Sequence, residues 1–206
     1  MNYGPDGSTA EGTTKLDYAR RLGGTLAYLA SGQGDAVGLY SAGKTFNREI
    51  RPKRSGAHLK FVLDELGEMK AEGETGLPEA LHQAAERIAQ RALVVVISDL
   101  FMDPETLKGA FQHLRFRKHD VAVFHLVEQN EIDFQFDRPI RFVDLEGAGP
   151  LLVDPTTIAK QYRQAVQTWL EQLRIVFRDS AVDYHRVNIA ENYSDVLAKF
   201  LLARKR

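Results

Sequence analysis

The chain has 206 residues, no cysteine, and 27 basic against 28 acidic side chains, which gives a formal net charge of −1. The lack of cysteine excludes disulfides, cysteine-ligated zinc, iron–sulfur clusters and thiol nucleophiles, and the balanced charge gives no electrostatic signal for nucleic acid. No apolar run approaches the roughly 20 residues that a membrane-spanning helix needs, and the first residues lack the pattern of a signal peptide. We therefore expect a soluble, cytoplasmic protein without a membrane span.

The first half of the sequence predicts a polar start, then helices and a pair of strands. Residues 1–13 are rich in Gly, Ser, Thr and Asp, which is typical of a flexible loop, and we expect a single domain over 14–206. Leucines then recur at helical spacing behind Thr13 and Thr14, either of which suits a helix N-cap. The predicted elements here are helices over 14–31, 55–66 and 78–91, with strands over 36–41 and 45–51 that pair antiparallel at a sheet edge.

The second half alternates strands with helices. Leu93–Ile97 is continuous, β-branched and apolar, which is typical of a strand covered by helices on both faces. The alternation predicts an α/β fold of doubly wound, Rossmann-like type: a mostly parallel sheet with helices on both faces and one antiparallel edge strand. The predicted elements are strands over 93–97, 121–127 and 181–187, helices over 104–116, 156–178 and 193–202, an acidic loop over 128–138, and a small antiparallel pair over 140–144 and 151–153.

One segment, Gly38–Thr45, satisfies the phosphate-loop pattern G-x-x-x-x-G-K-[ST] in full. A phosphate loop needs a strand before the first Gly and a helix that begins at the Lys-Thr pair. Here an apolar strand runs through the motif, and a strand-like, Pro-terminated segment follows. We therefore favour a hairpin turn at Ala42-Gly43-Lys44 and keep a nucleotide-binding protein that uses Gly38–Thr45 as the alternative function.

Two residues, Thr75 and Asp99, are candidates for metal binding. A hydroxyl from one loop and a carboxylate from a strand end suit a hard cation such as Mg²⁺, and ligand sites in open α/β sheets lie at the carboxyl ends of strands. Two ligands alone are a weak signal, and a helix-cap Thr with a turn Asp explains the pair equally well.

Other polar and aromatic residues have structural interpretations. His125 and His185 lie in predicted strands and are expected to be satisfied core or edge residues, and Trp169 is expected in the core. We interpret the acidic residues of 128–133 as a solvated rim. No His neighbours an evident nucleophile, and we expect a protein that is not an enzyme.

Several motifs resemble a bacterial von Willebrand factor A-like family known as domain of unknown function 58 (DUF58). They are Lys15-Leu16-Asp17-Tyr18-Ala19-Arg20, Gln33-Gly34-Asp35-Ala36-Val37-Gly38-Leu39, Val95-Val96-Ile97-Ser98-Asp99-Leu100-Phe101 and His119-Asp120-Val121. The resemblance covers essentially the whole chain. It implies a non-enzymatic protein-interaction module that assists a MoxR-type AAA+ ATPase in assembling or activating other proteins.

The resemblance also implies a metal-ion-dependent adhesion site, in which Mg²⁺ is held by an Asp-x-Ser-x-Ser motif, a Thr and an Asp. Thr75 and Asp99 match the second and third elements. The first element is missing, which argues against bound Mg²⁺: in the family it precedes a Met and a Tyr-Gly, and here Met1 and Tyr3-Gly4 take those places. Asp6–Ala10 imitates the motif, but it follows no predicted strand.

The strand that carries this motif lies in the family between the strands predicted over 36–41 and 93–97. Its loss would leave two rows of unpaired backbone groups, which is costly when they are buried. We expect one of three arrangements: the two strands close up, another copy of the chain fills the gap in a homo-oligomer, or the true start lies upstream of Met1.

Overall fold

The computed structural model describes residues 13–43, 46–70, 76–134, 140–143, 150–153 and 155–204. Helices and strands follow one another in the order that the sequence predicts, with one additional short helix in the acidic segment after Val127. The helices are α1 (Lys15–Gly32), α2 (Gly56–Glu68), α3 (Leu77–Arg87), α4 (Pro104–Phe116), α5 (Gln129–Asp133), α6 (Pro155–Asp179) and α7 (Tyr193–Arg204). The strands are β1 (Val37–Ala42), β2 (Phe46–Lys53), β3 (Leu93–Ser98), β4 (Asp120–Val127), β5 (Ile140–Val143), β6 (Pro150–Val153) and β7 (Asp183–Asn188).

The centre of the fold is a parallel sheet of three strands in the order β3-β4-β7. Leu93 of β3 lies opposite Asp120 of β4, and the register continues without a break to Ser98 opposite His125. Strand β4 pairs in parallel with β7 along its other side. The carboxyl ends of the three strands therefore meet at one edge of the sheet, which we call the carboxyl edge.

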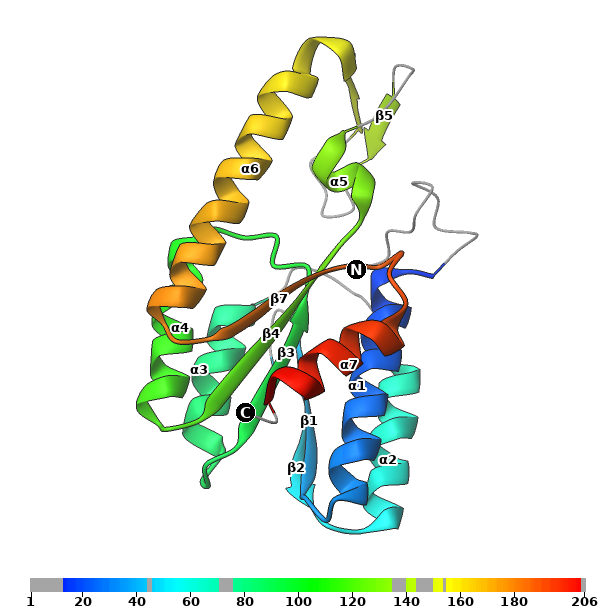
Figure 1. Cartoon of the computed structure of the whole chain (residues 1–206), viewed down its shortest axis with the longest axis vertical. Helices are drawn as coiled ribbons and strands as arrows, with labels where there is room; N and C mark the ends of the chain where they lie inside the picture. The colour runs from blue at the N-terminus through cyan, green and yellow to red at the C-terminus, as the bar shows by residue number, and fades with distance from the viewer. Residues whose placement is uncertain are drawn as a thin grey trace.

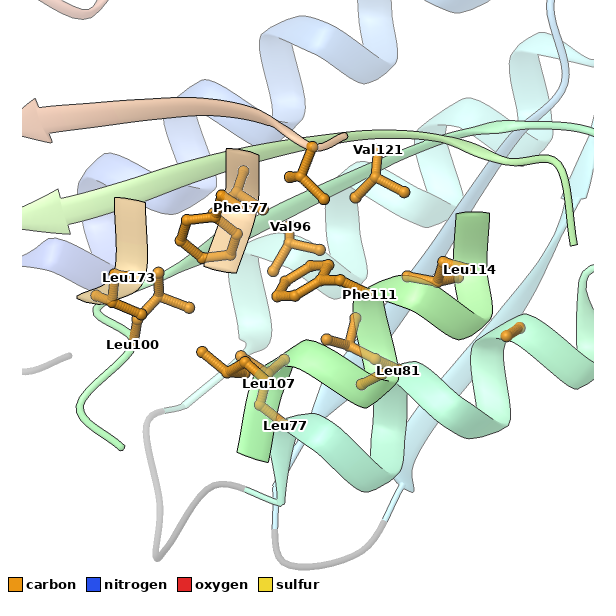
Figure 2. Packing of buried hydrophobic residues seen from close by; sticks show 14 residues of the cluster. Leu77, Leu81, Val96, Leu100, Leu107, Phe111, Leu114, Val121, Leu173 and Phe177 are labelled. Carbon is orange, nitrogen blue, oxygen red and sulfur yellow. The ribbon is translucent and has the colours of Figure 1, made fainter. Parts of the chain in front are cut away.

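Helices cover both faces of this sheet, as the sequence predicts (Figure 1). On one face, α1 and α7 pack on β4 and β7 in a cluster that includes Leu22, Phe124 and Phe200. On the other face, α3, α4 and α6 enclose a second cluster around Phe111 and Phe177 (Figure 2). The mixed α/β class with a parallel core is thus confirmed. None of the helices in the described ranges is both long and apolar enough to cross a membrane.

The β1–β2 hairpin forms a sheet of its own beside the parallel sheet. The antiparallel pairing of the two strands is confirmed, with Leu39 opposite Ile50. The prediction of one continuous sheet is not confirmed, because among the described strands β1 pairs only with β2 and β3 pairs only with β4. The two strands therefore do not close up, although α1 packs against both of them.

Local sequence signals set the helix starts. The Thr14 side chain accepts a hydrogen bond from the Asp17 N–H at the start of α1, and Ser55 does the same for His58 at the start of α2. Asp103 caps α4, whose first residue is Pro104. Helix α3 ends at Arg87, four residues before the predicted end. The predicted loop over 1–13 lies, apart from Thr13, outside the described residues.

Candidate functional site at the carboxyl edge of the sheet

The loop that follows β3 is held in a strained shape. Leu100 has a φ of 53°, a left-handed conformation that costs a leucine roughly 1–2 kcal/mol. The Ser98 Oγ accepts a hydrogen bond from the Leu100 N–H, and the Leu100 carbonyl accepts one from the Met102 N–H. The Leu100 side chain is fully buried beside Leu107 and Leu173 (Figure 2). Burial of this side chain thus fixes the conformation of a loop whose flanking residues are Asp99 and Phe101.

Phe101 projects from this loop at the carboxyl edge. Its side chain is 59% exposed, yet its ring stacks on Trp169 of α6 with centroids 5.5 Å apart and planes 7° from parallel. The Lys15 ammonium lies 4.9 Å from the centre of the same ring, within the range of a cation–π interaction. The Trp169 indole N–H donates to the Met102 carbonyl at 3.0 Å. Phe101 is therefore an exposed aromatic held in one orientation.

A buried ion pair lies beneath this surface. Lys15, the first residue of α1, is 1% exposed, and its Nζ lies 2.5 Å from Oε1 of Glu131, which is 15% exposed. The second carboxylate oxygen of Glu131 accepts the backbone N–H of Glu128 at 2.9 Å. The Glu131 carbonyl accepts the Tyr162 hydroxyl at 3.0 Å. Glu131 thus joins α1, α5 and α6 at the carboxyl edge.

Glu128 closes the amino end of α5. Its carboxylate accepts the Asn130 N–H at 2.8 Å, and with Glu131 it completes a reciprocal capping box. Burial raises the pKa of the Glu128 carboxyl, and the negative charge of Glu131 also raises it. The interpretation of residues 128–133 as a solvated rim is therefore wrong for Glu128 and Glu131, because a short helix turns both carboxylates inward.

His125 lies under the same edge, in β4. It is fully buried, and its Nδ1 lies 2.7 Å from the Tyr184 hydroxyl. Burial and, to a smaller extent, the positive charge of Lys15 lower the pKa of His125 to about 4. Burial also raises the pKa of Tyr184 to about 12. His125 is thus a core residue, as predicted, with Nδ1 hydrogen-bonded and no hydrogen bond found for its buried Nε2 in the described part of the chain, and it is neutral near pH 7.

The metal ligands predicted from the sequence are only partly described. Asp99 lies at the carboxyl edge directly after β3 and is half-buried, and Thr75 falls outside the described residues. Among the residues that are described, no group of three or more His, Cys, Asp or Glu side chains is placed to hold a metal ion. The described part of the edge therefore offers Mg²⁺ one predicted ligand, Asp99, and the carboxylate of Glu131 is paired with the Lys15 ammonium.

The phosphate-loop pattern falls on the hairpin. Gly38 to Ala42 lie in β1, and Ala42 pairs with Phe46 at the start of β2, so the first five residues of the motif have strand geometry. Gly38 has a structural role, because a Cβ there would lie 2.7 Å from the Ile50 carbonyl oxygen and 2.9 Å from Pro52. Lys44 and Thr45 lie outside the described residues. The antiparallel pairing of the strands on both sides of the segment is confirmed, and the predicted turn at Ala42-Gly43-Lys44 lies partly outside the described residues.

Sequence reasoning missed Lys15, Glu131 and Phe101. Lys15 and Glu131 are 116 positions apart in the chain, and no local pattern marks either as buried. Phe101 follows the predicted Asp99 by two positions, and an aromatic in a strand-end loop was the available signal. The hydrophobic pattern instead pointed to Trp169 as core, whereas its ring is only partly buried and supports Phe101.

Comparison with known proteins gives a family and a fold. Residues 5–173 match the model of the family described as "Protein of unknown function DUF58", which confirms the resemblance. A search of curated proteins found none that matches.

Two solved structures are similar at 16% sequence identity. One is an aerotolerance-related membrane protein from Bacteroides fragilis NCTC 9343, with a TM-score of 0.54 over 89% of this chain and 84% of that chain. The other is the conserved hypothetical protein BatB from Bacteroides thetaiotaomicron, with a TM-score of 0.51 over 92% of this chain and 88% of that chain. These likenesses support the α/β fold over most of the chain.

Proposed function

We propose that this chain, which belongs to the DUF58 family, is a non-enzymatic protein-interaction module of von Willebrand A type that binds its partner at the carboxyl edge. The binding surface is centred on Asp99 and Phe101. The partner is a MoxR-type AAA+ ATPase, as the family resemblance implies, and both act in the cytoplasm. The module assists that ATPase in assembling or activating other proteins.

Exposed but immobilised Phe101 is the single observation that carries the proposal. Aromatic side chains dominate the binding energy of protein interfaces because they bury a large area at a small entropic cost. Trp169 stacking and the Lys15 cation–π contact restrict the ring before any partner arrives. A restricted side chain loses little further entropy on binding, and a partner can bury the whole exposed side of the Phe101 ring.

The charges around this anchor favour a recognition surface that works without a metal. In the described residues, Lys15 supplies a positive charge between α1 and α5, and Glu131 neutralises it. Half-buried Asp99 leaves the edge with a carboxylate beside the aromatic anchor. A partner that presents an apolar pocket next to a basic or amide donor fits this combination, and Mg²⁺ is not required.

The test is an affinity measurement with purified MoxR-type ATPase from the same genome, immobilised and loaded with ATP. We expect Phe101→Ala to weaken binding at least about tenfold, which corresponds to about 1.4 kcal/mol. The matched control is Phe116→Ala, since Phe116 is 84% exposed at the carboxyl end of α4, where the chain turns back to the amino ends of the strands. Asp99→Asn should also weaken binding, whereas chelation by EDTA should leave it unchanged.

Three outcomes would overturn the proposal: no binding by the unaltered chain, equal losses in Phe101→Ala and Phe116→Ala, or hydrolysis of a substrate that disappears with Asp99→Asn. Circular dichroism of each variant separates loss of the surface from loss of the fold. If Mg²⁺ strengthens binding and Asp99→Asn abolishes that gain, the metal-independent form of the proposal is wrong.

A further inference from the structure

A pair of histidines lies on the opposite side of the fold from α1, where α3 and α4 pack together. The Nδ1 atoms of His82 in α3 and His113 in α4 are 3.0 Å apart, and the rings are tilted by 43° with centroids 5.2 Å apart. Both side chains are half-buried, so an ion can reach them from solvent. Neither residue contributes to the carboxyl edge.

Glu86 determines which ring nitrogen of a neutral His113 carries the hydrogen. Its Oε1 lies 2.9 Å from the His113 Nε2, so a neutral His113 carries its hydrogen on Nε2 and donates it to this carboxylate. The Nδ1 lone pair of His113 is then directed at His82, whose Nδ1–H completes the contact. Glu86 stands four residues after His82 on α3. A carboxylate that accepts the far N–H of an imidazole is the usual partner of a metal-binding histidine and makes the ring a stronger ligand.

We propose that His82 and His113 form a binding site for a divalent transition metal, Zn²⁺ in the first instance, that joins α3 to α4. Two nitrogens at Zn–N distances of about 2.0–2.1 Å in a tetrahedral shell are about 3.3 Å apart. The two nitrogens therefore have to move apart by only a few tenths of an ångström, and each ring has to turn so that its Nδ1 lone pair points at the ion. The His82 hydrogen moves from Nδ1 to Nε2, which frees a second lone pair without changing the total number of bound protons.

The rest of the shell comes from solvent. No group of three or more metal-binding side chains is found within the described ranges, so two waters complete a tetrahedron around the ion. The Arg117 Nε donates to the Ala85 carbonyl at 3.2 Å and holds the end of α4 against α3. The positive charge of Arg117 opposes cation binding, and Glu86 on the same face offsets it. Imidazole nitrogen suits Zn²⁺, Ni²⁺ and Cu²⁺ and does not suit Mg²⁺.

Calorimetric titration of the full chain with Zn²⁺ tests the site. We expect one Zn²⁺ per chain, with a more than tenfold loss of affinity in both His82→Gln and His113→Gln. Glu86→Gln should keep the stoichiometry and lose about tenfold in affinity, because it removes the supporting carboxylate and keeps both ligands. His58→Gln in α2 is the matched control and should bind as the unaltered chain does, and Mg²⁺ should give no heat of binding.

A second measurement keeps the proposal testable if a variant unfolds. The electron paramagnetic resonance spectrum of Cu²⁺ bound to the unaltered chain should show coupling to two nitrogens, and this signal should be lost when Zn²⁺ is added in large excess, since Cu²⁺ is the tighter-binding ion. Failure of the unaltered chain to bind Zn²⁺ would overturn the site, as would an unchanged affinity in His82→Gln. A spectrum without two-nitrogen coupling would overturn it as well.

Discussion

The two ends of the parallel sheet carry similar residue types but arrange them differently. At the carboxyl edge, Lys15 is 1% exposed and pairs with a nearly buried Glu131. At the amino edge, Asp120 pairs with Arg91 at 2.9 Å and with Arg115 at 3.3 Å, all partly or largely in solvent. Burial makes the first pair a constraint on the fold, whereas solvent makes the second pair nearly neutral in energy. The carboxyl edge is thus the end at which side-chain positions are fixed.

Backbone strain distinguishes the two ends in the same way. Leu100 at the carboxyl edge and Lys118 at the amino edge both have left-handed φ angles, 53° and 66°. Lys118 is exposed in the turn between α4 and β4, so its strain has no side-chain burial to maintain it. The left-handed conformation of Leu100 is maintained by the burial of its side chain in the core.

Replacing each of these residues by glycine should give effects of opposite sign. Leu100→Gly relieves the strain but empties a core position, and we expect a net loss of about 3 kcal/mol in the free energy of unfolding. Lys118→Gly relieves strain alone and should gain about 0.5–1 kcal/mol. Urea denaturation of both variants measures the difference, and a loss in Lys118→Gly would show that the two positions are not distinguished by burial.

Acidification should act through the carboxyl edge. The pKa of His125 is about 4 in the folded chain against 6.5 for the ordinary group, so the unfolded chain binds more protons between these pH values. The contribution of His125 to the free energy of unfolding is therefore complete above about pH 6.5. It falls by up to about 3 kcal/mol as the pH drops to about 4. The raised pKa of Glu128 acts with the opposite sign, since a protonated carboxyl is then favoured in the folded chain.

The contribution of His125 is isolated by comparing the unaltered chain with His125→Gln. Thermal denaturation at several pH values should show a weaker acid dependence in His125→Gln than in the unaltered chain. Equal slopes in the two proteins would show that His125 is not the group that titrates.

Removal of the Lys15 charge and removal of the Arg91 charge should lower the free energy of unfolding by unequal amounts. Lys15→Met leaves Glu131 without its partner and should cost about 2 kcal/mol, since the carboxylate retains some access to water. Arg91→Met should cost less than about 1 kcal/mol. The double variant Lys15→Met/Glu131→Gln should recover much of the loss, because Gln still accepts the Glu128 N–H. Equilibrium unfolding that ranks Arg91→Met above Lys15→Met would contradict the contrast between the two ends.

Elements defined by local signals could be predicted from the sequence. Helix α4 has its predicted bounds because Asp103 caps it and Pro104 occupies its first position, and the apolar run of β3 predicted a strand covered by helices on both faces. Contacts between distant positions could not be predicted. The Lys15–Glu131 pair depends on how α1 meets α5, and the separation of β1 from β3 depends on hydrogen bonding that no hydrophobic pattern records.

The candidate site was predicted in outline. Parallel topology directed attention to the strand ends, and Asp99 lies there. The exposed aromatic residue was not predicted, because the hydrophobic pattern does not distinguish Phe101 from the apolar residues of the buried strand that precedes it. Its exposure follows from the left-handed Leu100, which takes the buried position in the loop.

Hydrogen exchange of the chain with and without its MoxR-type ATPase tests the central claim most directly. If the carboxyl edge is the binding surface, the partner should slow exchange in residues 98–103 and 128–134 and leave residues 115–120 unchanged. Protection confined to 115–120, or no protection at residues 98–103 in a complex that forms, would contradict it.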